Sequence, residues 1–559
     1  MNFKIADSKF KELLIPSLLL VMALNISSVV DSFFLGRFIG PNAVAAIELL
    51  EPVILLMTVF EWLFGLGGQI ISINKKSEFD IEGSNRYFTV SMVVSFIASV
   101  ILAIVWLLFM DPLAPYLGAS HATKPLLLQY SIYLAPCFIV STISAVLTQY
   151  IRVDDQPNFA SAVIIIANVI NIILDYMFLS WGWGMGSASL ASFIGYAISL
   201  VVCLWYIRHP KRTFRFIRSA LKIKTFIKTT WKMTKIGFPG ASTGIFDVIF
   251  VYIMNKFLAF TLGDIGLTTY MLCIDILVIG SIVNVGISET LTSIVPVYYS
   301  KHDYVNLKHL IKISLLMGFS FAVILTLFIW IWPEGFLALY KFEHMEIAGF
   351  AINAIKLYSL FFVLSVLPSI LIFYYEAIKR SILSTVLSLL YTLVLPVIFV
   401  ISLYYMIGPN GIWLGFPVAC LITGIFIFLS ANLIQKREPK YSTIFFIEKD
   451  LIDKTENFVL TDNDLNARKK CLNHLKNLNA NDEFCDNVNK IFDVIFDNNP
   501  HDTYVEVLVI DYDDNIHVDI KYDGEHENLE QLKHNFQEGL FKYTEVLGLN
   551  AIEYEMKKI

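Results

Sequence analysis

Three polar residues with helical spacing stand inside a long apolar stretch of the chain, NVINIILDYMF at 168–178. At about 100° per residue, Asn168, Asn171 and Asp175 fall within about 60° of one another and form one polar stripe. An ionised carboxylate is costly at membrane depth, so such residues usually face a water-filled path or a partner. The stripe therefore indicates an ion or substrate site, and the alternative is a polar contact between helices.

The composition of the 559 residues indicates a polytopic α-helical membrane protein. Hydrophobic residues make up 56%, aromatic residues 14% and charged residues only 16%. Many apolar runs exceed the roughly 18 residues that can cross lipid. The pattern predicts twelve transmembrane helices, at 13–35, 44–73, 87–110, 125–150, 158–180, 186–207, 236–262, 268–298, 311–332, 350–375, 383–407 and 411–434.

Lysine and arginine are strongly biased to one side of the predicted helices. One set of loops carries 25 of them, whereas the other set carries only Arg37, Lys124 and Lys341. The positive-inside rule then predicts a multi-pass plasma-membrane protein with both termini in the cytoplasm. The most basic loop, 208–235, is expected to serve as a topology signal that lies against anionic membrane lipid, and binding to nucleic acid is not favoured.

The membrane part contains an internal repeat at an offset of 223 residues. The equivalent pairs are Pro16 and Pro239, Gly40 and Gly263, and Asp80 and Asp303. Because each half has an even number of helices, the repeats are parallel, and a ligand path is expected between them. We predict an N-terminal six-helix lobe at 1–207, a basic cytoplasmic linker at 208–235 and a C-terminal six-helix lobe at 236–435.

The charge balance changes sign near residue 440. Residues 1–440 hold 30 basic and 23 acidic residues, a net charge of +7, whereas 441–559 hold 12 and 25, a net charge of −13. Helical spacing at 483–498 is followed by strand alternation at 504–525 with a hairpin turn. We therefore expect a small cytoplasmic α+β domain at 441–559.

Two stretches of the first half resemble the signature regions of the MATE family, the multidrug and toxic compound extrusion proteins. They are VVDSFFLGRFIGPNAVAA at 29–46 and YIRVDDQPNFASAVIIIANVINIILDYMF at 150–178, and the likeness extends to 182–192 and 285–303. The resemblance implies a twelve-helix antiporter with two pseudo-symmetric lobes, which exports organic and often cationic compounds in exchange for Na⁺ or H⁺. It also implies an ion-coupling site formed by Asp31, Asn171, Asp175 and Ser192.

The chemistry of these residues agrees with an ion site. Two carboxylates that share one site cannot both remain ionised without a counter-cation, so Asp31 and Asp175 could hold either Na⁺ or a proton. With Asn171 they offer the oxygen ligands that Na⁺ requires, and no other cofactor is expected. The repeat places Met254 and Leu403 at the equivalent points of the second half. The carboxylate site is therefore expected in the first lobe only.

Three further residues are candidates for a substrate or second ion site. Asp247 lies where one branch of the MATE family has a functional glutamate, and a helix contact is an equally weighted alternative. Glu61 lies deep in the second predicted helix and could join the site, as could Asn168. Three other acids are expected to make interior polar contacts or to lie at the membrane interface: Asp275, Glu289 and Glu376.

The C-terminal domain is similar to the histidine-kinase-type ATPase fold of anti-sigma-factor kinases. In that fold a Glu-x-x-x-Asn helix holds Mg²⁺-nucleotide, an Asp-x-Gly motif contacts adenine and a glycine-rich lid covers the phosphates. Here Asp493 is followed by Asp497, Tyr522 replaces the adenine aspartate, and only Gly539 and Gly548 remain where a lid would be. The nucleotide site is expected to be lost, which favours a regulatory module or one that binds a cytoplasmic protein partner.

Secondary active export of amphipathic organic cations, by a monomer, is the leading functional hypothesis. Acids outnumber bases at membrane depth, and a negative cavity concentrates cations. The alternatives are a flippase for a lipid-linked precursor and a membrane sensor that signals through the C-terminal domain. A membrane enzyme is least favoured, because the predicted helices carry no nucleophile–base pair, HExxH or Walker sequence.

Overall fold

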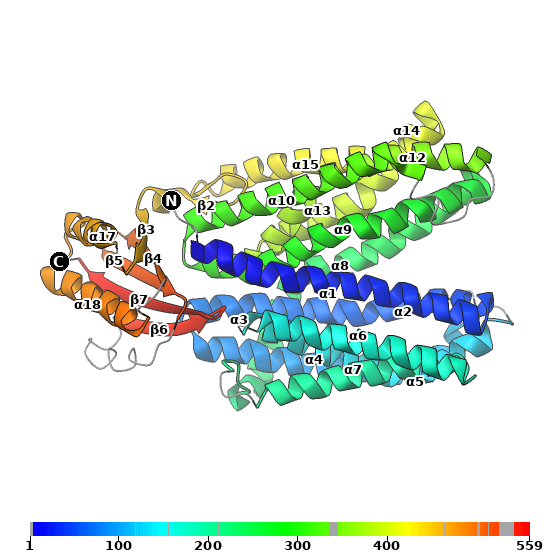
Figure 1. Cartoon of the computed structure of the whole chain (residues 1–559), viewed down its shortest axis with the longest axis horizontal. Helices are drawn as coiled ribbons and strands as arrows, with labels where there is room; N and C mark the ends of the chain where they lie inside the picture. Colours follow the sequence, from blue (N-terminus) through cyan, green and yellow to red (C-terminus); the bar gives the residue numbers. More distant parts are fainter. Residues whose placement is uncertain are drawn as a thin grey trace.

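The computed structural model describes residues 4–558 apart from 118, 120, 155, 209–211, 335–344, 463, 500–502, 513 and 525–540. Long helices form two bundles that lie side by side, and the strands of the C-terminal domain lie at one end of them (Figure 1). The first helix begins at that same end. We call this end of the molecule the tail side, the other end the far side, and residues 441–558 the tail domain.

The first lobe consists of seven helices and one π-helical segment in the described part of the chain. They are α1 (Lys4–Phe38), α2 (Pro41–Phe60), η1 (Glu61–Leu66), α3 (Gly67–Ser77), α4 (Ile81–Leu113), α5 (Lys124–Val153), α6 (Pro157–Ser180) and α7 (Gly186–Tyr206). The segments α2, η1 and α3 follow one another without a break. Short π-helical turns inside longer helices often occur at functional sites, and this one begins at Glu61.

The second lobe has the same plan. Its elements are α8 (Ile223–Thr261), α9 (Gly263–Ser300), α10 (Tyr304–Ile331), α12 (Met345–Ala377), α13 (Ser381–Leu389), η3 (Leu390–Val394), α14 (Leu395–Ile407) and α15 (Pro409–Arg437). The short 3₁₀ helix η2 (Arg218–Leu221) precedes them. The π-helical segment η3 ends two residues before Pro396, which lacks the backbone N–H that a regular helix requires.

Part of the segment 208–235, predicted as a linker, is helical. The helix α8 starts at Ile223 and runs for 39 residues, which is about 58 Å at about 1.5 Å per residue. The hydrocarbon core of a membrane is only about 30 Å thick. The additional turns at 223–235 therefore extend beyond the apolar span that the sequence predicted from 236.

Eleven helices in the described part of the chain are long and apolar enough to cross a membrane, so the protein is a multi-pass membrane protein. The first predicted helix, 13–35, is not among the eleven. Its residues belong to α1, which packs along α6 and α9. Several of its side chains, from residue 24 to residue 32, lie outside the described residues, so the count of eleven does not test this helix. Twelve transmembrane helices therefore remain a prediction.

The internal repeat is visible in the turns between helices. Asp80 caps α4 by accepting a hydrogen bond from the Gly83 amide at 2.8 Å, and Asp303 caps α10 in the same way. The residues before these caps, Phe79 and His302, both have positive φ values of 61° and 57°. The pair predicted from the 223-residue offset therefore makes the same turn in both lobes.

The tail domain is a five-stranded antiparallel sheet with two longer helices. Its sheet contains β3 (Thr455–Thr461), β4 (Tyr504–Asp511), β5 (Asn515–Tyr522), β6 (Phe541–Val546) and β7 (Leu549–Lys557), in the order β3-β4-β5-β7-β6. The helices are α17 (Leu465–Asn477) and α18 (Asp482–Asn498), and a small hairpin of β1 (Tyr441–Ser442) and β2 (Ile447–Glu448) with α16 (Lys449–Ile452) precedes them. The predicted helix at 483–498 and the predicted hairpin at 504–525 are confirmed.

The alternation of side chains gives the tail sheet two buried faces. Val507 and Val509 of β4 pack with α17 and α18 in one apolar core. Leu508 and Ile510, on the other face of the same strand, belong to the apolar core of the membrane helices. The sheet therefore lies between its own helices and the tail-side ends of the lobes (Figure 1).

Candidate functional site

A cavity of about 270 Å³ lies between α1, α6 and α7 in the first lobe. Its lining consists of Ser27, Asp31, Ala167, Asn168, Asn171, Ser192 and Tyr196. The structure thus brings together four of the predicted residues, Asp31, Asn168, Asn171 and Ser192. Asp175 lies one helical turn beyond Asn171 and is 1% exposed.

Hydrogen bonds connect the three helices through the Asn171 side chain. Its amide nitrogen donates to Asp175 Oδ2 and to Ser192 Oγ, both at 3.1 Å. Its carbonyl oxygen accepts from Ser27 Oγ at 3.3 Å. Asn171 therefore holds α1 and α7 around the carboxyl group of Asp175.

Asp31 and Asp175 lie close enough for their carboxyl groups to interact directly. One oxygen of each, Oδ1, is buried without a hydrogen-bond partner among the described residues. No lysine, arginine or histidine of the described chain pairs with either carboxyl group. Two such groups favour a shared proton or a bound cation, because their mutual repulsion is otherwise uncompensated. The unpartnered oxygens are suitable ligands for Na⁺, a hard cation.

Two polar lining residues, Ser27 and Tyr196, were not predicted from the sequence, and neither was the apolar Ala167. Ser27 lies four residues before Asp31 on α1, and Tyr196 lies four residues after Ser192 on α7. Residues four apart share one face of a helix. Extending the predicted set by one turn along each helix would have included both.

The other predicted acids lie apart from this cavity. Glu61 accepts a hydrogen bond from Gln149 Nε2 at 3.2 Å and is not part of the lining. Asp247 belongs to the second lobe, and its side chain is exposed. A Cβ atom added at Gly244, one turn earlier on α8, would meet nothing within 4 Å. Asp247 therefore lies on a side of α8 that faces open space.

The lobes contact each other closely on the tail side. Arg152 of α5 forms an ion pair with Glu289 of α9 at 2.6 Å, and both side chains are largely buried. Gln69 Nε2 also donates to Ser293 Oγ at 3.2 Å. The hydrogen bonds that join described residues of the two lobes lie in the tail-side halves of their helices.

Two further interior acids were predicted to make polar contacts, and the structure describes both. Glu289 makes the ion pair above, and Glu376 accepts a hydrogen bond from the Gly240 amide at 3.4 Å. Both predictions are confirmed. The side chain of Asp275 lies outside the described residues.

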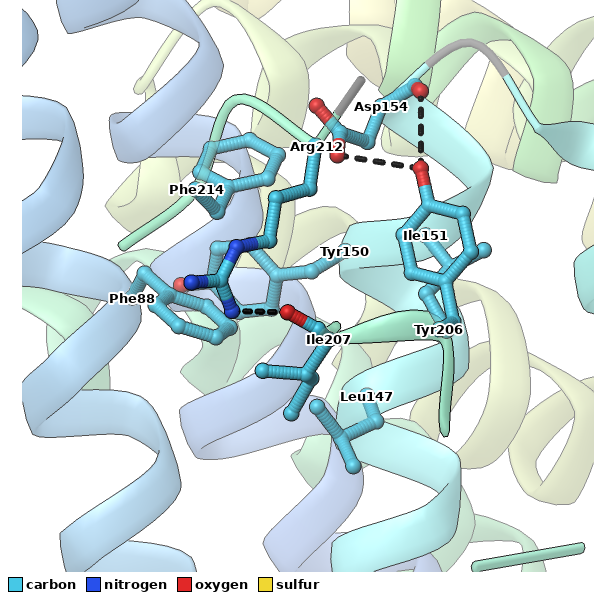
Figure 2. Close-up of a pocket in the computed structure, with 9 residues that line it drawn as sticks. All are labelled: Phe88, Leu147, Tyr150, Ile151, Asp154, Tyr206, Ile207, Arg212 and Phe214. Atoms are coloured by element: carbon cyan, nitrogen blue, oxygen red, sulfur yellow. Dashed lines mark hydrogen bonds between the residues drawn. The ribbon is translucent and has the colours of Figure 1, made fainter. Parts of the chain in front are cut away.

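A second cavity of about 270 Å³ lies under the linker on the tail side of the first lobe (Figure 2). Aromatic and aliphatic side chains form most of it: Phe88, Leu147, Tyr150, Ile151, Tyr206, Ile207 and Phe214. Its acid, Asp154, accepts hydrogen bonds from the Tyr206 hydroxyl at 3.1 Å and from the Thr213 amide. These bonds fasten the linker to the lobe, so we interpret the cavity as a packing feature.

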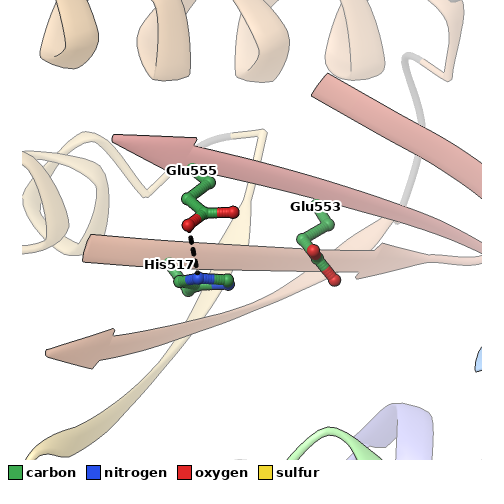
Figure 3. Close-up of side chains that lie close together, drawn as sticks. All are labelled: His517, Glu553 and Glu555. Carbon is green, nitrogen blue, oxygen red and sulfur yellow. Dashed lines mark ion pairs between the residues drawn. The ribbon is translucent and has the colours of Figure 1, made fainter. Parts of the chain in front are cut away.

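A histidine and two glutamates approach one another on the membrane-facing side of the tail sheet (Figure 3). His517 Nε2 lies 3.1 Å from Glu555, and Glu553 pairs with Lys301 at 2.6 Å and with Lys542 at 2.9 Å. A metal ion would have to displace these cations. We therefore interpret the group as part of the ionic contacts of the tail domain.

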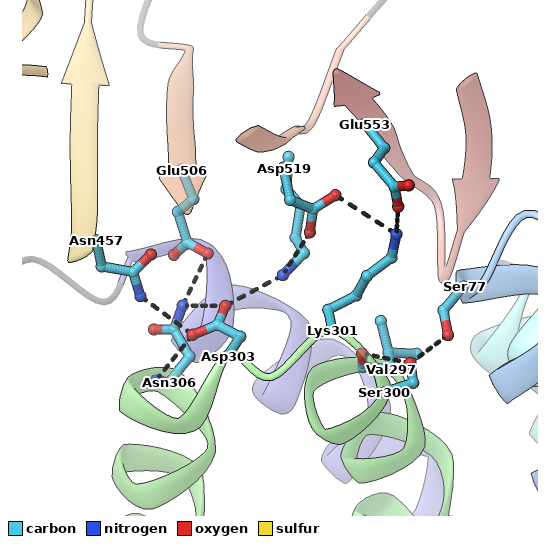
Figure 4. Close-up of polar contacts among 11 residues, drawn as sticks. Ser77, Val297, Ser300, Lys301, Asp303, Asn306, Asn457, Glu506, Asp519 and Glu553 are labelled. Carbon is cyan, nitrogen blue, oxygen red and sulfur yellow. Dashed lines mark hydrogen bonds and ion pairs between the residues drawn. The ribbon is translucent and has the colours of Figure 1, made fainter. Parts of the chain in front are cut away.

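The tail domain docks on the turn between α9 and α10 through buried charges (Figure 4). Asp303 forms an ion pair with Lys521 Nζ at 3.1 Å and accepts a hydrogen bond from Asn457 Nδ2, also at 3.1 Å. Burial disfavours the charge of Lys521, but Asp303 and the other nearby acids hold its pKa above the usual value. Lys521 and Asp303 therefore form a buried ion pair between the tail domain and the second lobe.

Glu506 is the least well neutralised carboxyl group of this docking site. It accepts a hydrogen bond from Asn306 Nδ2 at 3.1 Å and contacts the backbone of Ala6 in α1. Burial, and after it the charge of Asp303, raises the pKa of Glu506 to about 7. This contact links the tail domain to the first lobe as well.

Apolar and aromatic contacts complete the docking. The carbonyl groups of Ile444, Phe445 and Phe446, in the small hairpin, accept hydrogen bonds from the hydroxyls of Tyr375, Tyr374 and Tyr299 at 2.8–3.0 Å. Phe446 is fully buried, and Leu508 and Ile510 join the same core. The interface therefore resembles a domain interior more than a transient surface contact.

Comparisons with known proteins agree with the fold. A sequence profile of the MatE family matches residues 16–177. The chain is 24% identical over 307 residues to the multidrug export protein MepA of Staphylococcus haemolyticus. This match covers 54% of the present chain and 66% of MepA, so the chain spans just under two thirds of that relative's length. It is 20% identical over 440 residues to the probable multidrug resistance protein YoeA of Bacillus subtilis, which covers 76% of this chain and 93% of that relative.

The solved structures extend the match to nearly a whole transporter. A multidrug resistance MATE family transporter of the MOP superfamily, solved in an outward-facing conformation, superimposes with a TM-score of 0.72 at 20% identity. The match covers 97% of that chain and 78% of this one, about the share that the two lobes occupy. Together, these matches show that the two lobes have the fold of MATE family transporters and that residues 16–177 match the profile of that family.

Proposed function

We propose that the protein is a secondary active antiporter that exports amphipathic organic cations in exchange for H⁺ or Na⁺. The observation that supports this proposal is the pair Asp31 and Asp175, which lie together in one lobe, each with one buried oxygen that has no hydrogen-bond partner among the described residues. A proton or Na⁺ neutralises the pair, and its release restores a charge that the membrane interior disfavours. Binding of the ion therefore changes the free energy of the lobe, which antiport requires.

The lobe contacts suggest how this change is coupled to movement. Alternating access requires the tail-side contacts, including Arg152 with Glu289, to break while the far side closes. The helix α1 carries Asp31 and also packs against α9 of the second lobe. Neutralising Asp31 and Asp175 would allow α1 to shift against α6, and that shift would reach the interface between lobes. In this proposal the tail side faces the cytoplasm, as the positive-inside rule favours for the side that carries the basic loops.

Transport under separately imposed gradients tests this proposal. Purified protein is reconstituted into liposomes that contain ethidium. Movement of ethidium across the liposome membrane is then followed while either a Na⁺ or an H⁺ gradient is applied alone. Transport is expected under at least one gradient and should stop when that gradient is collapsed. Equal ethidium movement with and without both gradients would contradict antiport.

The cargo class follows from the charges at membrane depth. Asp31, Asp175 and Asp247 are acids, and a negative field concentrates cations and disfavours anions. A flippase for a pyrophosphate-linked lipid would need cations in the same place. A binding panel that compares ethidium with an anionic flavin nucleotide at fixed pH and salt distinguishes the two. Saturable binding of the flavin nucleotide alone would reverse this assignment.

The tail domain is, in this proposal, a brake on the transporter. It contacts the second lobe through Asp303 and the first lobe through the backbone of Ala6. Lys542 of β6 also lies 5.9 Å from the ring of Phe79 in the first lobe. Opening of the tail side must separate these points, so the docked domain opposes that step. Undocking would release it.

The repeat provides a matched pair of variants for this brake. Asp303→Asn keeps the helix cap of α10 but removes the charge that Lys521 binds, whereas Asp80→Asn makes the same change at the equivalent cap of α4. Asp303 is 1% exposed under the tail domain, while the Asp80 side chain is 45% exposed. Asp303→Asn should raise the rate of export severalfold, and Asp80→Asn should leave it within twofold. A lower rate for Asp303→Asn in well-inserted protein would contradict the brake.

A further inference from the structure

A strongly basic hollow opens on the tail side between α4 and α8. It encloses about 590 Å³, its open mouth included. The lining consists of Arg86, Tyr87, Lys224, Thr225, Lys228, Thr229 and Lys232. Four of the seven residues are cations, and none is an acid. The hydroxyl groups of Tyr87, Thr225 and Thr229 add further hydrogen-bond donors.

The three lysines of this hollow have no carboxylate partner among the described residues. They follow one another at intervals of four along α8, so they form one row on that helix. Arg86 has a single acid nearby, Glu82, at 3.6 Å. The neighbouring Lys379 has its pKa lowered by burial; the charge of Glu78 opposes this shift, and the charges of Lys75 and Lys232 add to it. The hollow therefore carries an excess of positive charge that the protein does not neutralise.

The first turns of α8 place this charge at the level of lipid headgroups. Ile223, Ile227 and Trp231 are 78%, 62% and 61% exposed, and they form a second row beside the lysines. An exposed row with two isoleucines and a tryptophan is typical of a helix segment at the membrane interface. The helix is also too long for the hydrocarbon core, so its start lies beyond it.

We propose that this hollow binds the phosphate headgroup of an anionic phospholipid. The ammonium groups of Lys228 and Lys232 and the guanidinium group of Arg86 would donate hydrogen bonds to the phosphate oxygens. The acyl chains would lie along Ile227 and Trp231. A free phosphate would satisfy the cations but would leave the exposed apolar row uncovered. Because α4 and α8 belong to different lobes, the bound lipid would touch both.

The proposal can be tested on the full chain in a neutral detergent. Binding of dihexanoyl phosphatidylglycerol is measured by calorimetry, with dihexanoyl phosphatidylcholine and inorganic phosphate as the other ligands. The anionic lipid is expected to bind saturably, at least tenfold more tightly than either of the others. The variant Lys228→Gln with Lys232→Gln should lose at least tenfold in affinity for it.

A matched variant separates a built site from general attraction. Lys308 and Lys312 are also exposed, spaced four apart and near the tail-side end of a second-lobe helix, α10. The variant Lys308→Gln with Lys312→Gln should bind phosphatidylglycerol within twofold of the unmodified protein. Equal losses in both double variants, or no saturable binding to the unmodified protein, would overturn the proposal. Equally tight binding of inorganic phosphate would overturn the assignment to a lipid.

Discussion

Carboxylates are clustered in two regions of this molecule, and their surroundings differ. In the docking site of the tail domain, Asp303, Asp519 and Glu553 each have a lysine nitrogen within 4 Å. In the first lobe, Asp31 and Asp175 have one another and an asparagine, but no cationic side chain of the described chain. The same chemical group is therefore paired with lysines of the protein in one region, and in the other it is left, in our proposal, to a proton or Na⁺.

In our proposal, this difference separates carboxylates with a structural role from carboxylates with a role in transport. A carboxylate with a permanent lysine partner stabilises one arrangement of the chain, and removing its partner leaves a buried charge. A carboxylate without such a partner must acquire a proton or a metal ion and can release it again. Mutations of the two groups of carboxylates should therefore have different effects on transport activity and on stability.

The largest effect is expected for Asp175→Asn. The amide keeps the size of the side chain and its contact with Asn171, but it cannot exchange a proton or hold Na⁺ as a carboxylate does. Gradient-driven export should fall to background in liposomes, while thermal stability stays equal or rises because a like-charge contact is removed. Asp111→Asn, at an exposed aspartate that pairs with Lys124 on the far side, is the control. Ion-driven export by Asp175→Asn at the normal rate would remove the basis of the comparison.

Lys521→Met should have the next largest effect. Unlike Asp175→Asn, it should lower the stability of the protein. It leaves Asp303 and Asp519 buried without their shared lysine, a change that typically costs about 3–5 kcal/mol. The tail domain should then undock, and hydrogen exchange in β4 and β5 should become faster by more than tenfold. Lys470→Met, at an exposed lysine of α17, should leave exchange unchanged. Unaltered protection in Lys521→Met would show that the charges are not what holds the domain.

A smaller effect is expected from pH, through Glu506. Its pKa is raised in the docked state to about 7 from about 4.5, so docking is strongest below about 4.5 and this contribution is lost as the pH rises through about 7. The groups around it are Asp303, Lys521, Asn306 and the backbone of Ala6. Hydrogen exchange of the tail domain should therefore become faster between pH 6 and pH 8.

Glu506→Gln provides the control for this pH effect. The amide resembles the protonated acid, so the variant should show little change between pH 6 and pH 8. Burial lowers the pKa of nearby His302, which opposes the trend only as the pH falls through about 6.5. A pH response of equal size in Glu506→Gln would assign the effect to another group.

The smallest effect is expected for Ser192→Ala. It removes one hydrogen bond to Asn171 but no carboxylate, a loss of about 1 kcal/mol. The ion concentration for half-maximal export should rise about fivefold, with the maximal rate unchanged. Ser180→Ala, at an exposed serine at the end of α6, should have no effect. A complete loss of export in Ser192→Ala would mean that the hydroxyl is essential to coupling.

Much of the membrane part could be predicted from the sequence, because each helix is marked by the residues of its own segment. Apolar runs define the helices, since lipid leaves no other way to satisfy backbone polar groups. Helical spacing placed Asn168, Asn171 and Asp175 on one face, and the repeat identified the equivalent caps Asp80 and Asp303. The limits of helices were less accurate, because a helix such as α8 continues beyond the lipid, where hydropathy no longer marks it.

Contacts between distant segments, by contrast, could not be predicted from the sequence. The alternating polar residues of β4, β5 and β7 are typical of a strand face in water, yet Glu506, Asp519 and Lys521 are all less than 5% exposed. Their burial depends on a surface more than 200 residues away, the turn that contains Asp303. Likewise, Glu61 and Asp175 are both acids in apolar helices, and packing alone separates them. The spacing of residues shows which side chains share one face of a helix or strand. Which other element covers that face depends on the whole fold.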